Sequence, residues 1–253
     1  MAAYYQSDID LAANVATSVG LRLLEMQETL SDCDPEELGH RGDLSAHELI
    51  SSQLMMVHPN DVVLSEEGID DGSRLFAPRV WLVDPLDGTR DFSLGRKQWA
   101  VQIAIWTKEA RDITAAVVYI PAFQVLLKTK DAIRYKHSTN LPPSIAVSRT
   151  RAPSIVARLA QQTGSVIIGA GSVGFKVWLV ICGRADAYVH AGSMHEWDTA
   201  APVAVARAAD LHVSRFDGTS IAFNTPSAIT DQILVCRPEI ADTFIRILGE
   251  NCP

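Results

Sequence analysis

The chain has 253 residues, is 47% hydrophobic and carries a formal net charge of −8 at pH 7. That length can bury one large core or two closely packed halves. The acidic balance and the lack of clustered Lys and Arg exclude a general affinity for nucleic-acid backbones. The four cysteines are widely spaced, without a Cys-x-x-Cys pair, so neither a zinc site nor a disulfide framework is indicated.

The sequence has no targeting or membrane signal. Its first residues lack a basic region followed by an apolar one, and the longest apolar stretch, 113–127, contains Pro121 and is too short to cross a bilayer. We therefore expect a soluble cytoplasmic protein that binds neither membranes nor nucleic acid.

Two helices are predicted before any strand. Apolar residues recur at helical spacing over 7–30, with Ser7 and Asp10 as a capping pair, and a second helix is predicted over 43–57 after a polar stretch at 31–42. Short β-rich runs follow, and several are expected to pair in one mostly antiparallel sheet: 62–64, 80–83, 99–106, 113–120 and 125–128.

The second half alternates more evenly between the two kinds of element. Strands are predicted at 145–147, 166–168, 187–190 and near Leu211 and Ile233, and helices at 154–162, 173–182, 197–208 and 239–248. The pattern indicates a layered α/β protein in two halves. We treat residues 1–253 as one structural unit with subdomains 1–138 and 139–253, divided softly at 138–144.

Acidic residues follow two of the predicted strands. The run 80–83 leads into Asp84-Pro85-Leu86-Asp87-Gly88, which taken alone is typical of a turn. The run 62–64 leads into Ser65-Glu66-Glu67-Gly68. In a third segment, Asp198 stands at the start of a predicted helix, where the helix dipole alone would explain it.

Carboxylates from these segments would not stay ionised together without cations. If Glu66, Asp84, Asp87 and Asp198 converge, their all-oxygen ligand set favours Mg²⁺ or Mn²⁺, and the lack of well-spaced His and Cys disfavours zinc. Paired divalent ions are the usual apparatus for displacement at phosphorus. The sequence therefore predicts metal-assisted hydrolysis of a phosphate ester.

Three motifs resemble, in order and spacing, the signatures of the inositol monophosphatase superfamily. They are Glu66-Glu67, Asp84-Pro85-Leu86-Asp87-Gly88-Thr89 and Trp197-Asp198-x-Ala200-Ala201-Pro202. The resemblance covers essentially the whole chain and implies a five-layer αβαβα sandwich.

The resemblance also implies a metal site. Glu66, Asp84 and the backbone carbonyl of Leu86 would hold a first Mg²⁺, and Asp84, Asp87 and Asp198 a second. Mn²⁺ would substitute, and Li⁺ would inhibit by replacing one Mg²⁺. Water bound to metal would attack phosphorus directly, without a phosphoenzyme.

The phosphate itself would contact the motif that follows Asp87. In the family pattern Gly88 and Thr89 offer backbone N–H groups, the Thr89 hydroxyl helps to position the attacking water, and Asp43 pairs with that threonine. Catalytic roles are thus expected for Asp43, Glu66 and Thr89, and substrate contacts for Asp87, Gly88, Thr89 and Asp198.

One departure from the family pattern concerns a third metal. The family usually has a longer loop with Lys-x-Asp and Ser-Pro-x-Thr-x-x-Asp before the second helix, whereas here only 39–43 stand in that place. The shortening leaves open both the third Mg²⁺, for which Glu67 is a candidate ligand, and the sensitivity to lithium.

Residues after Thr89 bear on the substrate. Arg90-Asp91-Phe92 resembles the CysQ-type members that act on bisphosphorylated nucleotides, which have a basic residue and Glu before the Phe. Inositol-type members have an uncharged residue and Asn there. A local surface pair between Arg90 and Asp91 is the alternative interpretation.

A glycine-rich segment, 169–174, fits G-x-G-x-x-G between a predicted strand and helix. It lacks a clear acidic residue about 20 positions on and does not open a βαβ unit, so a dinucleotide fold is not the preferred interpretation. Instead Gly171, Ser172 and Lys176 would bind a substrate's second phosphate at the helix start, as the CysQ-type resemblance implies. Close packing of strand on helix is the alternative.

The leading hypothesis is a nucleotidase that removes the 3′-phosphate of 3′-phosphoadenosine 5′-phosphate, giving AMP in sulfur metabolism. Inositol phosphate, fructose 1,6-bisphosphate or another sugar or nucleotide phosphate is the alternative within the class. A non-catalytic nucleotide-binding protein, or an NAD(P)-binding oxidoreductase, is the alternative from another class. Many relatives are dimers, so a homodimer is kept open.

Overall fold

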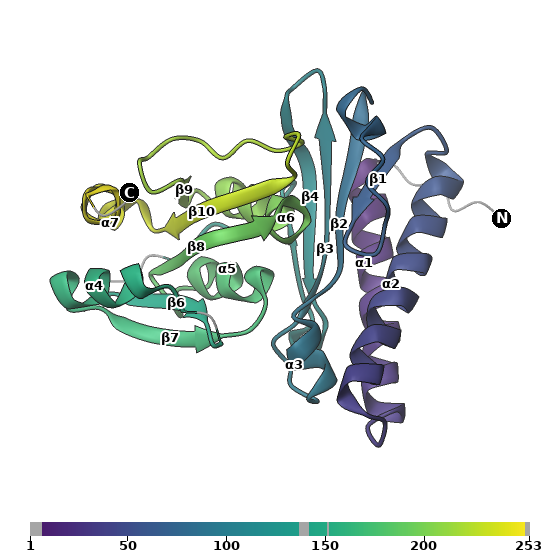
Figure 1. Ribbon diagram of the computed structural model, residues 1–253, viewed down its shortest axis with the longest axis horizontal. Coiled ribbons are helices and arrows are strands. Elements are labelled where there is room, and N and C mark those ends of the chain that lie inside the picture. The colour runs from purple at the N-terminus through teal and green to yellow at the C-terminus, as the bar shows by residue number, and fades with distance from the viewer. Residues whose placement is uncertain (1–6, 137–141, 151, 251–253) are drawn as a thin grey trace.

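The computed structural model describes residues 7–136, 142–150 and 152–250, and its elements form five successive layers (Figure 1). The order of layers is α1 with α2, a first sheet, α5 with α6, a second sheet, and α4 with α7. The helices are α1 (Asp8–Thr29), α2 (Pro35–Val57), α3 (Thr89–Ser93), α4 (Ser154–Thr163), α5 (Val173–Ile181), α6 (Glu196–Ala208) and α7 (Pro238–Gly249), with short 3₁₀ turns at Ser73–Leu75 and Pro121–Phe123. The expected αβαβα sandwich is confirmed.

The first sheet has the order β1-β2-β3-β4-β5, in which β1 runs parallel to β2 and the other pairs are antiparallel. Its strands are β1 (Val62–Ser65), β2 (Arg79–Asp87), β3 (Ala100–Thr107), β4 (Asp112–Ile120) and β5 (Val125–Lys128). The prediction of one mostly antiparallel sheet is confirmed.

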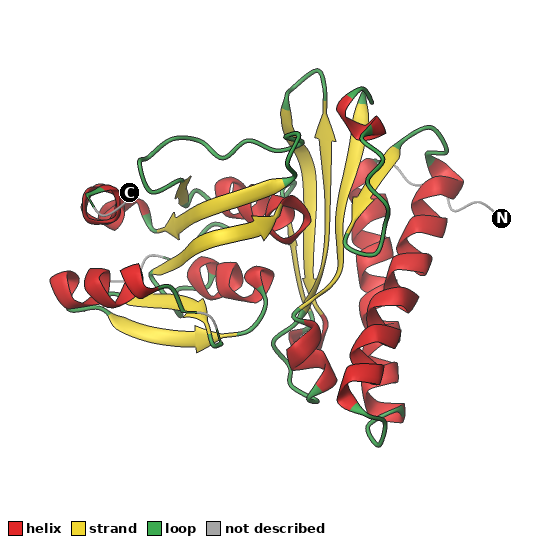
Figure 2. Ribbon diagram, viewed as in Figure 1, coloured by secondary structure: helices red, strands yellow, loops and turns green. Residues whose placement is uncertain are grey.

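The second sheet has the order β7-β6-β8-β10-β9 and stands apart from the first across the middle helices (Figure 2). β6 is parallel to β7 and β8, whereas β10 is antiparallel to β8 and β9. Its strands are β6 (Ser144–Ser148), β7 (Val166–Ala170), β8 (Ala187–His195), β9 (His212–Ser214) and β10 (Ile229–Cys236).

Both faces of the first sheet are buried, and alternation along β3 shows how. Val101, Ile103 and Ile105 join the core formed with α1 and α2, while Ala100 and Ala104 join the core shared with α5 and α6. The period of two sends successive side chains to opposite faces. Small alanines on one face allow α6 to approach the sheet closely.

Helix α2 is longer than predicted. The stretch 31–42 was expected to be a polar connection before a helix at 43–57, but the helix begins at Pro35, where the Asp34 carboxylate accepts from the N–H of Glu36 at 2.9 Å. A proline in the first turn after an Asp cap is a favoured helix start. The glycines at 39 and 42, which weaken the helical signal, let the helix lie against α3.

The extent of two strands also differs from the prediction. β2 continues past Val83 to Asp87 through an irregularity between Asp84 and Asp87, and β8 continues past His190 to His195. Part of the predicted boundary at 138–144 lies outside the described residues, so the division into subdomains stays a prediction. Among the described helices, none is long and apolar enough to span a membrane.

Candidate active site

A pocket of about 800 Å³ opens where loops from the two sheets meet. Of the residues predicted for the site, it is lined by Glu66, Asp84, Leu86, Asp87, Gly88, Thr89, Arg90, Gly171, Ser172, Lys176 and Asp198. Asp43 is not among the lining residues, but it contacts the lining residue Thr89. The fold thus gathers segments that are more than a hundred positions apart in the sequence.

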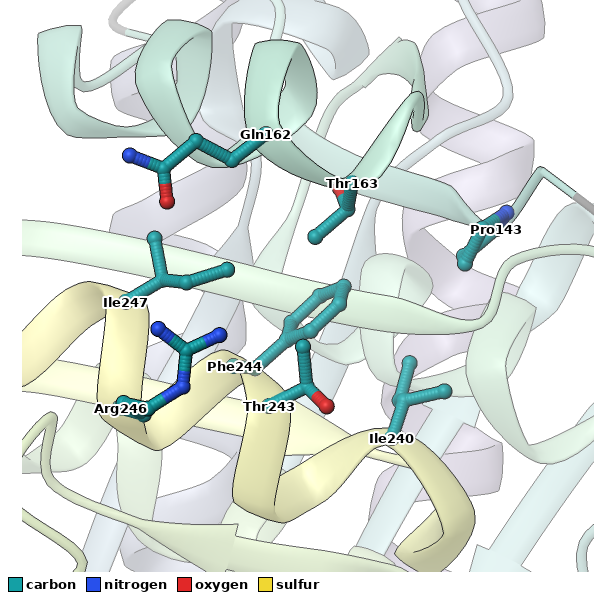
Figure 3. A pocket seen from close by; sticks show the side chains of 8 residues that line it. All are labelled: Pro143, Gln162, Thr163, Ile240, Thr243, Phe244, Arg246 and Ile247. Carbon is teal, nitrogen blue, oxygen red and sulfur yellow. The ribbon is translucent and has the colours of Figure 1, made fainter.

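A second pocket, of about 280 Å³, lies between α4 and α7 (Figure 3). Its wall is mostly apolar and includes Phe244, Ile240 and Ile247, with Arg246 as its charged side chain. No carboxylate lines it, so the chemistry that the sequence predicts belongs to the larger pocket.

Asp84 lies at the irregular end of β2 and is 2% exposed. Its Oδ1 accepts a hydrogen bond from the Leu86 N–H at 3.0 Å, which folds the backbone back toward the carboxylate. Burial, and then the nearby charges of Asp87 and Asp198, raise the pKa of Asp84 well above its usual range. A carboxylate held there in its ionised form calls for a cation.

Asp87 is buried and held from several directions. Its Oδ2 accepts from Ser172 Oγ at 2.6 Å, from Gly174 N–H at 2.9 Å and from the Gln102 side-chain amide. Burial raises the pKa of Asp87, while the Lys176 ammonium and the Ser172 hydrogen bond oppose that rise. The donors come from β3 of the first sheet and from the start of α5 in the middle layer, so groups from two layers hold the Asp87 carboxylate in place.

Asp198 and Glu66 complete the acidic group. Asp198, in the first turn of α6, accepts from the His195 N–H at 3.0 Å, and burial together with Asp87 and Glu66 raises its pKa to about 7. Glu66 follows β1; its side chain reaches solvent, yet partial burial of the carboxylate and the charges of Glu67 and Asp87 raise its pKa. The four carboxylates therefore act on one another electrostatically.

Asp43 and Thr89 contact each other between α2 and α3. Thr89 Oγ1 lies 3.2 Å from Asp43 Oδ1 and 3.1 Å from the Leu86 carbonyl, and its one proton can serve either acceptor. Burial and the charge of Glu66 raise the pKa of Asp43 to about 7. At Gly42, a Cβ would stand 2.9 Å from Leu86 Cδ2, so the missing side chain lets α2 bring Asp43 to the site.

The donor set fits hard divalent cations, because it consists of carboxylates and a backbone carbonyl, and because crowding disfavours ionisation of every acid in it. In the part of the chain that the structure describes, no three Asp, Glu, His or Cys side chains are already arranged to hold an ion. Asp84, Asp87 and Asp198 accept hydrogen bonds from protein groups, and the ligand set stays a prediction.

The polar side chains of the glycine-rich turn and of the helix after it hydrogen-bond to other groups of the protein. Lys176 is 5% exposed, and its ammonium donates to the carbonyls of Gly171 and Ser172, each at 2.7 Å, with the Tyr188 ring 5.3 Å away. Burial lowers the pKa of Lys176 to about 8 against the opposing charge of Asp87. The predicted phosphate contacts of Ser172 and Lys176 stay predictions, since both groups already have protein partners.

The alternative of a surface pair between Arg90 and Asp91 is wrong. Asp91 is 5% exposed, and its carboxylate pairs with Arg96 and Arg149, while Arg90 is exposed on the pocket wall. Arg149 also lines the pocket and was missed, because it follows β6 and only the sheet order brings it near α3.

Two aromatic side chains line the pocket at the start of α6. The His195 and Trp197 side chains stack at 4.2 Å between centroids with 5° between planes, and both line the pocket. His195 is also the N-cap residue of α6, so the same residue lies at the pocket rim and at the start of the helix.

Comparisons with known proteins identify the family of this chain. Residues 5–250 match the model of the inositol monophosphatase family. The 3′-phosphoadenosine 5′-phosphate phosphatase of Mycobacterium leprae is 40% identical over 96% of this chain and 94% of its own length. The 3′(2′),5′-bisphosphate nucleotidase CysQ of Escherichia coli is 32% identical over 72% of this chain and 77% of its own.

Among solved structures, the extragenic suppressor protein SuhB of Bartonella henselae superimposes with a TM-score of 0.76 at 22% identity. The superposition covers 97% of this chain and 100% of that one, and at this identity it bears on the fold alone. The family model and the Mycobacterium leprae relative span nearly the whole chain, and this chain therefore belongs to the inositol monophosphatase family.

Proposed function

We propose that this chain is a Mg²⁺-dependent phosphomonoesterase that converts 3′-phosphoadenosine 5′-phosphate to AMP and phosphate. The observation that carries the proposal is the gathering of Glu66, Asp84, Asp87 and Asp198 in one pocket, where their pKa values are raised. The choice of substrate is supported by relatives with that name at up to 40% identity.

Two metal positions are proposed. Glu66, Asp84 and the Leu86 carbonyl would hold one ion, and Asp84, Asp87 and Asp198 the other. When bound, Mg²⁺ supplies charge neutralisation for the phosphate and lowers the pKa of water. A third ion near Glu67 and inhibition by Li⁺ both stay predictions. The family loop tied to the third metal has no counterpart here, because residues 39–43 lie within α2.

Asp43 is proposed to accept the proton of the Thr89 hydroxyl. Asp43 Oδ1 lies 3.2 Å from Thr89 Oγ1, so the Asp43 carboxylate can accept the proton of that hydroxyl in a hydrogen bond. In this role Asp43 orients the hydroxyl and Thr89 orients the attacking water, while the backbone N–H groups of Gly88 and Thr89 bind the phosphate. Gly88 has φ +97°, a conformation that favours glycine.

A pocket of about 800 Å³ suits a ligand larger than a phosphate group. The exposed guanidinium of Arg90 on its wall suits an anionic substituent, and the stacked rings at His195 and Trp197 suit a flat base. These features support a nucleotide over an inositol or a sugar.

Phosphate release tests the proposal directly. The substrates are 3′-phosphoadenosine 5′-phosphate, inositol 1-phosphate and fructose 1,6-bisphosphate, each with and without Mg²⁺. The enzymes are the wild type, Asp84→Asn and a control, Asp61→Asn, whose carboxylate bonds Arg79 and Trp81 outside the pocket. We expect Mg²⁺-dependent preference for the nucleotide, lost in Asp84→Asn and kept in the control.

Other outcomes separate the parts of the proposal. Preference for another ester would keep the phosphatase and discard the substrate. Release that survives Asp84→Asn would discard the metal site, and release from none of the three would favour a binding protein. Whether the purified chain forms a homodimer is checked independently by sedimentation.

A further inference from the structure

Asp91 and Arg149 form an ion pair in the wall of the pocket. Asp91 lies in α3, two residues after Thr89, and its carboxylate side chain is 6% exposed. Arg149, 58 positions later, donates from Nη1 to Asp91 Oδ1 at 2.8 Å and to Oδ2 at 2.9 Å. Arg96 Nη1 adds a third hydrogen bond, to Oδ1 at 3.0 Å. The pair joins a loop of the first sheet to a loop of the second.

Arg149 also binds the glycine-rich turn. Its backbone N–H donates to the Ala170 carbonyl at 3.0 Å, and its Nη2 donates to the Gln98 side-chain oxygen. The same Gln98 oxygen accepts from the Gly171 N–H at 3.0 Å. Backbone and side chain of Arg149 thus hold the Ala170–Gly171 peptide group at the start of the turn between β7 and α5, directly at its carbonyl and through Gln98 at its N–H.

The turn lies directly on Asp91. A Cβ at Gly171 would stand 2.1 Å from Asp91 Oδ2 and 2.5 Å from the Gln98 carbonyl, so only glycine fits between them. The next residue, Ser172, has φ +28°, an unusual conformation for a residue with a side chain. From there its hydroxyl reaches Asp87 at 2.6 Å. Contacts run without a gap from Asp91 to Asp87.

We propose that Asp91 and Arg149 form a latch that positions the Gly171–Ser172 turn against Asp87, so that Arg149 is a positioning residue for the metal site. The inference deepens the proposed function and rests on it for its activity assay. Residues that hold a metal ligand in place typically alter metal affinity or activity by about 10- to 100-fold when replaced.

The competing role for Arg149 is direct contact with a substrate's second phosphate, since its side chain is 34% exposed and lines the pocket. The two roles predict different results for Asp91→Asn. If the latch positions Ser172, loss of the Asp91 charge weakens the site. If Arg149 is a phosphate ligand, the same change releases the guanidinium and leaves binding equal or tighter.

The experiment compares wild type, Asp91→Asn, Arg149→Gln and the double variant on 3′-phosphoadenosine 5′-phosphate and on 3′-AMP, which lacks the second phosphate. We expect each single variant to lower kcat/KM by about tenfold or more on both substrates. The double variant is expected to lose little more than either single one, because both changes break one pair. Titration calorimetry of Mn²⁺ is expected to show weaker binding by a similar factor.

Arg207→Gln is the matched control. Arg207 is 29% exposed, pairs with Asp112 and donates to the Ile221 carbonyl, and it does not line the pocket. We expect it to lose thermal stability comparable to Arg149→Gln while Mn²⁺ binding and kcat/KM stay at wild-type values. Thermal unfolding of every variant separates misfolding from loss of positioning.

The latch is overturned if Arg149→Gln raises KM only for the bisphosphate and leaves Mn²⁺ binding unchanged. It is also overturned if the two single variants add fully. If the wild type releases phosphate from neither nucleotide, the proposed function fails, and the Mn²⁺ titration alone decides the latch: weaker binding in both variants supports it, and unchanged binding ends it.

Discussion

Ser172 Oγ donates a hydrogen bond of 2.6 Å to Asp87 Oδ2, across 85 positions of sequence. The same hydroxyl accepts from the Phe175 N–H at 3.0 Å and so caps α5. One side chain therefore starts a helix beside the second sheet and holds a carboxylate that ends a strand of the first. The contact links the stability of the middle layer to the geometry of the candidate metal site.

Replacing Ser172 tests its two roles, the hydrogen bond to Asp87 and the N-cap of α5. A hydrogen bond to a charged group contributes about 1.5–3 kcal/mol, so Ser172→Ala and Ser172→Gly should each lower kcat/KM by roughly 10- to 100-fold. Loss of the cap should cost about 1 kcal/mol of unfolding free energy for alanine and less for glycine, which also tolerates φ +28°. Steady-state kinetics and thermal unfolding measure the two effects. Equal activity in wild type and both variants would refute the assigned contact.

The glycine-rich segment offers an internal comparison. Gly171→Ala should destabilise the protein and abolish activity, because the new methyl group would overlap Asp91 and the Gln98 carbonyl. Gly169→Ala should be tolerated, since its Cβ would have its nearest contact at 3.5 Å, with Arg149 Cα, at ordinary van der Waals distance. Thermal unfolding and phosphate release check both. A stable, active Gly171→Ala variant would contradict the described packing of the turn on Asp91.

The sequence predicted the elements that carry strong local signals. Periodicity located α1 and α7 within one or two residues, and the capping pair of Ser7 and Asp10 is present. The predicted start of α2 was wrong because Gly39 and Gly42 weaken helix propensity, while here Gly39 packs closely on Thr89, and Gly42 on Phe92 and Leu86. A local rule failed where tertiary contacts decided the conformation.

In the site too, local sequence patterns were predictive and tertiary contacts were not predictable. Motif spacing found the carboxylates that line the pocket, because each stands in a distinctive local pattern. Arg149 and Gln98 have no such pattern, and their importance depends on sheet order and on side chains from distant segments. The surface pair considered for Asp91 was wrong for the same reason, since its partner Arg149 could be placed near Asp91 only once β6 was known to lie beside β7 and β8.

Asp84→Asn should abolish phosphate release and make the metal-free protein more stable. Asp84 is buried among like charges that raise its pKa well above the usual range, so a neutral side chain of the same shape relieves repulsion in the metal-free protein. We expect its melting temperature at pH 8 in EDTA to lie several degrees above that of the wild type, with phosphate release lost. Mg²⁺ should stabilise the wild type and have little effect on the variant. A variant less stable than the wild type in EDTA would argue against charge crowding at this position.

The metal-free protein should lose stability as pH rises through neutrality. Burial and neighbouring acids raise the pKa of Asp43 and of Asp198 from 3.8 to about 7 in the folded state. Between these values the folded protein binds more protons than the unfolded chain, so stability falls with increasing pH. The melting temperature in EDTA should thus decrease from pH 5 to pH 8.

Two comparisons test whether these carboxyls cause the decrease. Asp43→Asn should flatten the decline, whereas Asp112→Asn, outside the pocket, should keep the wild-type slope. Mg²⁺ binds the ionised carboxylates, so its stabilising effect should be larger at pH 8 than at pH 5. Differential scanning fluorimetry across pH, with EDTA or Mg²⁺, measures all of this. A wild-type melting temperature that rises from pH 5 to pH 8 in EDTA would show that other groups dominate and that the acidic cluster does not govern the stability of the metal-free fold.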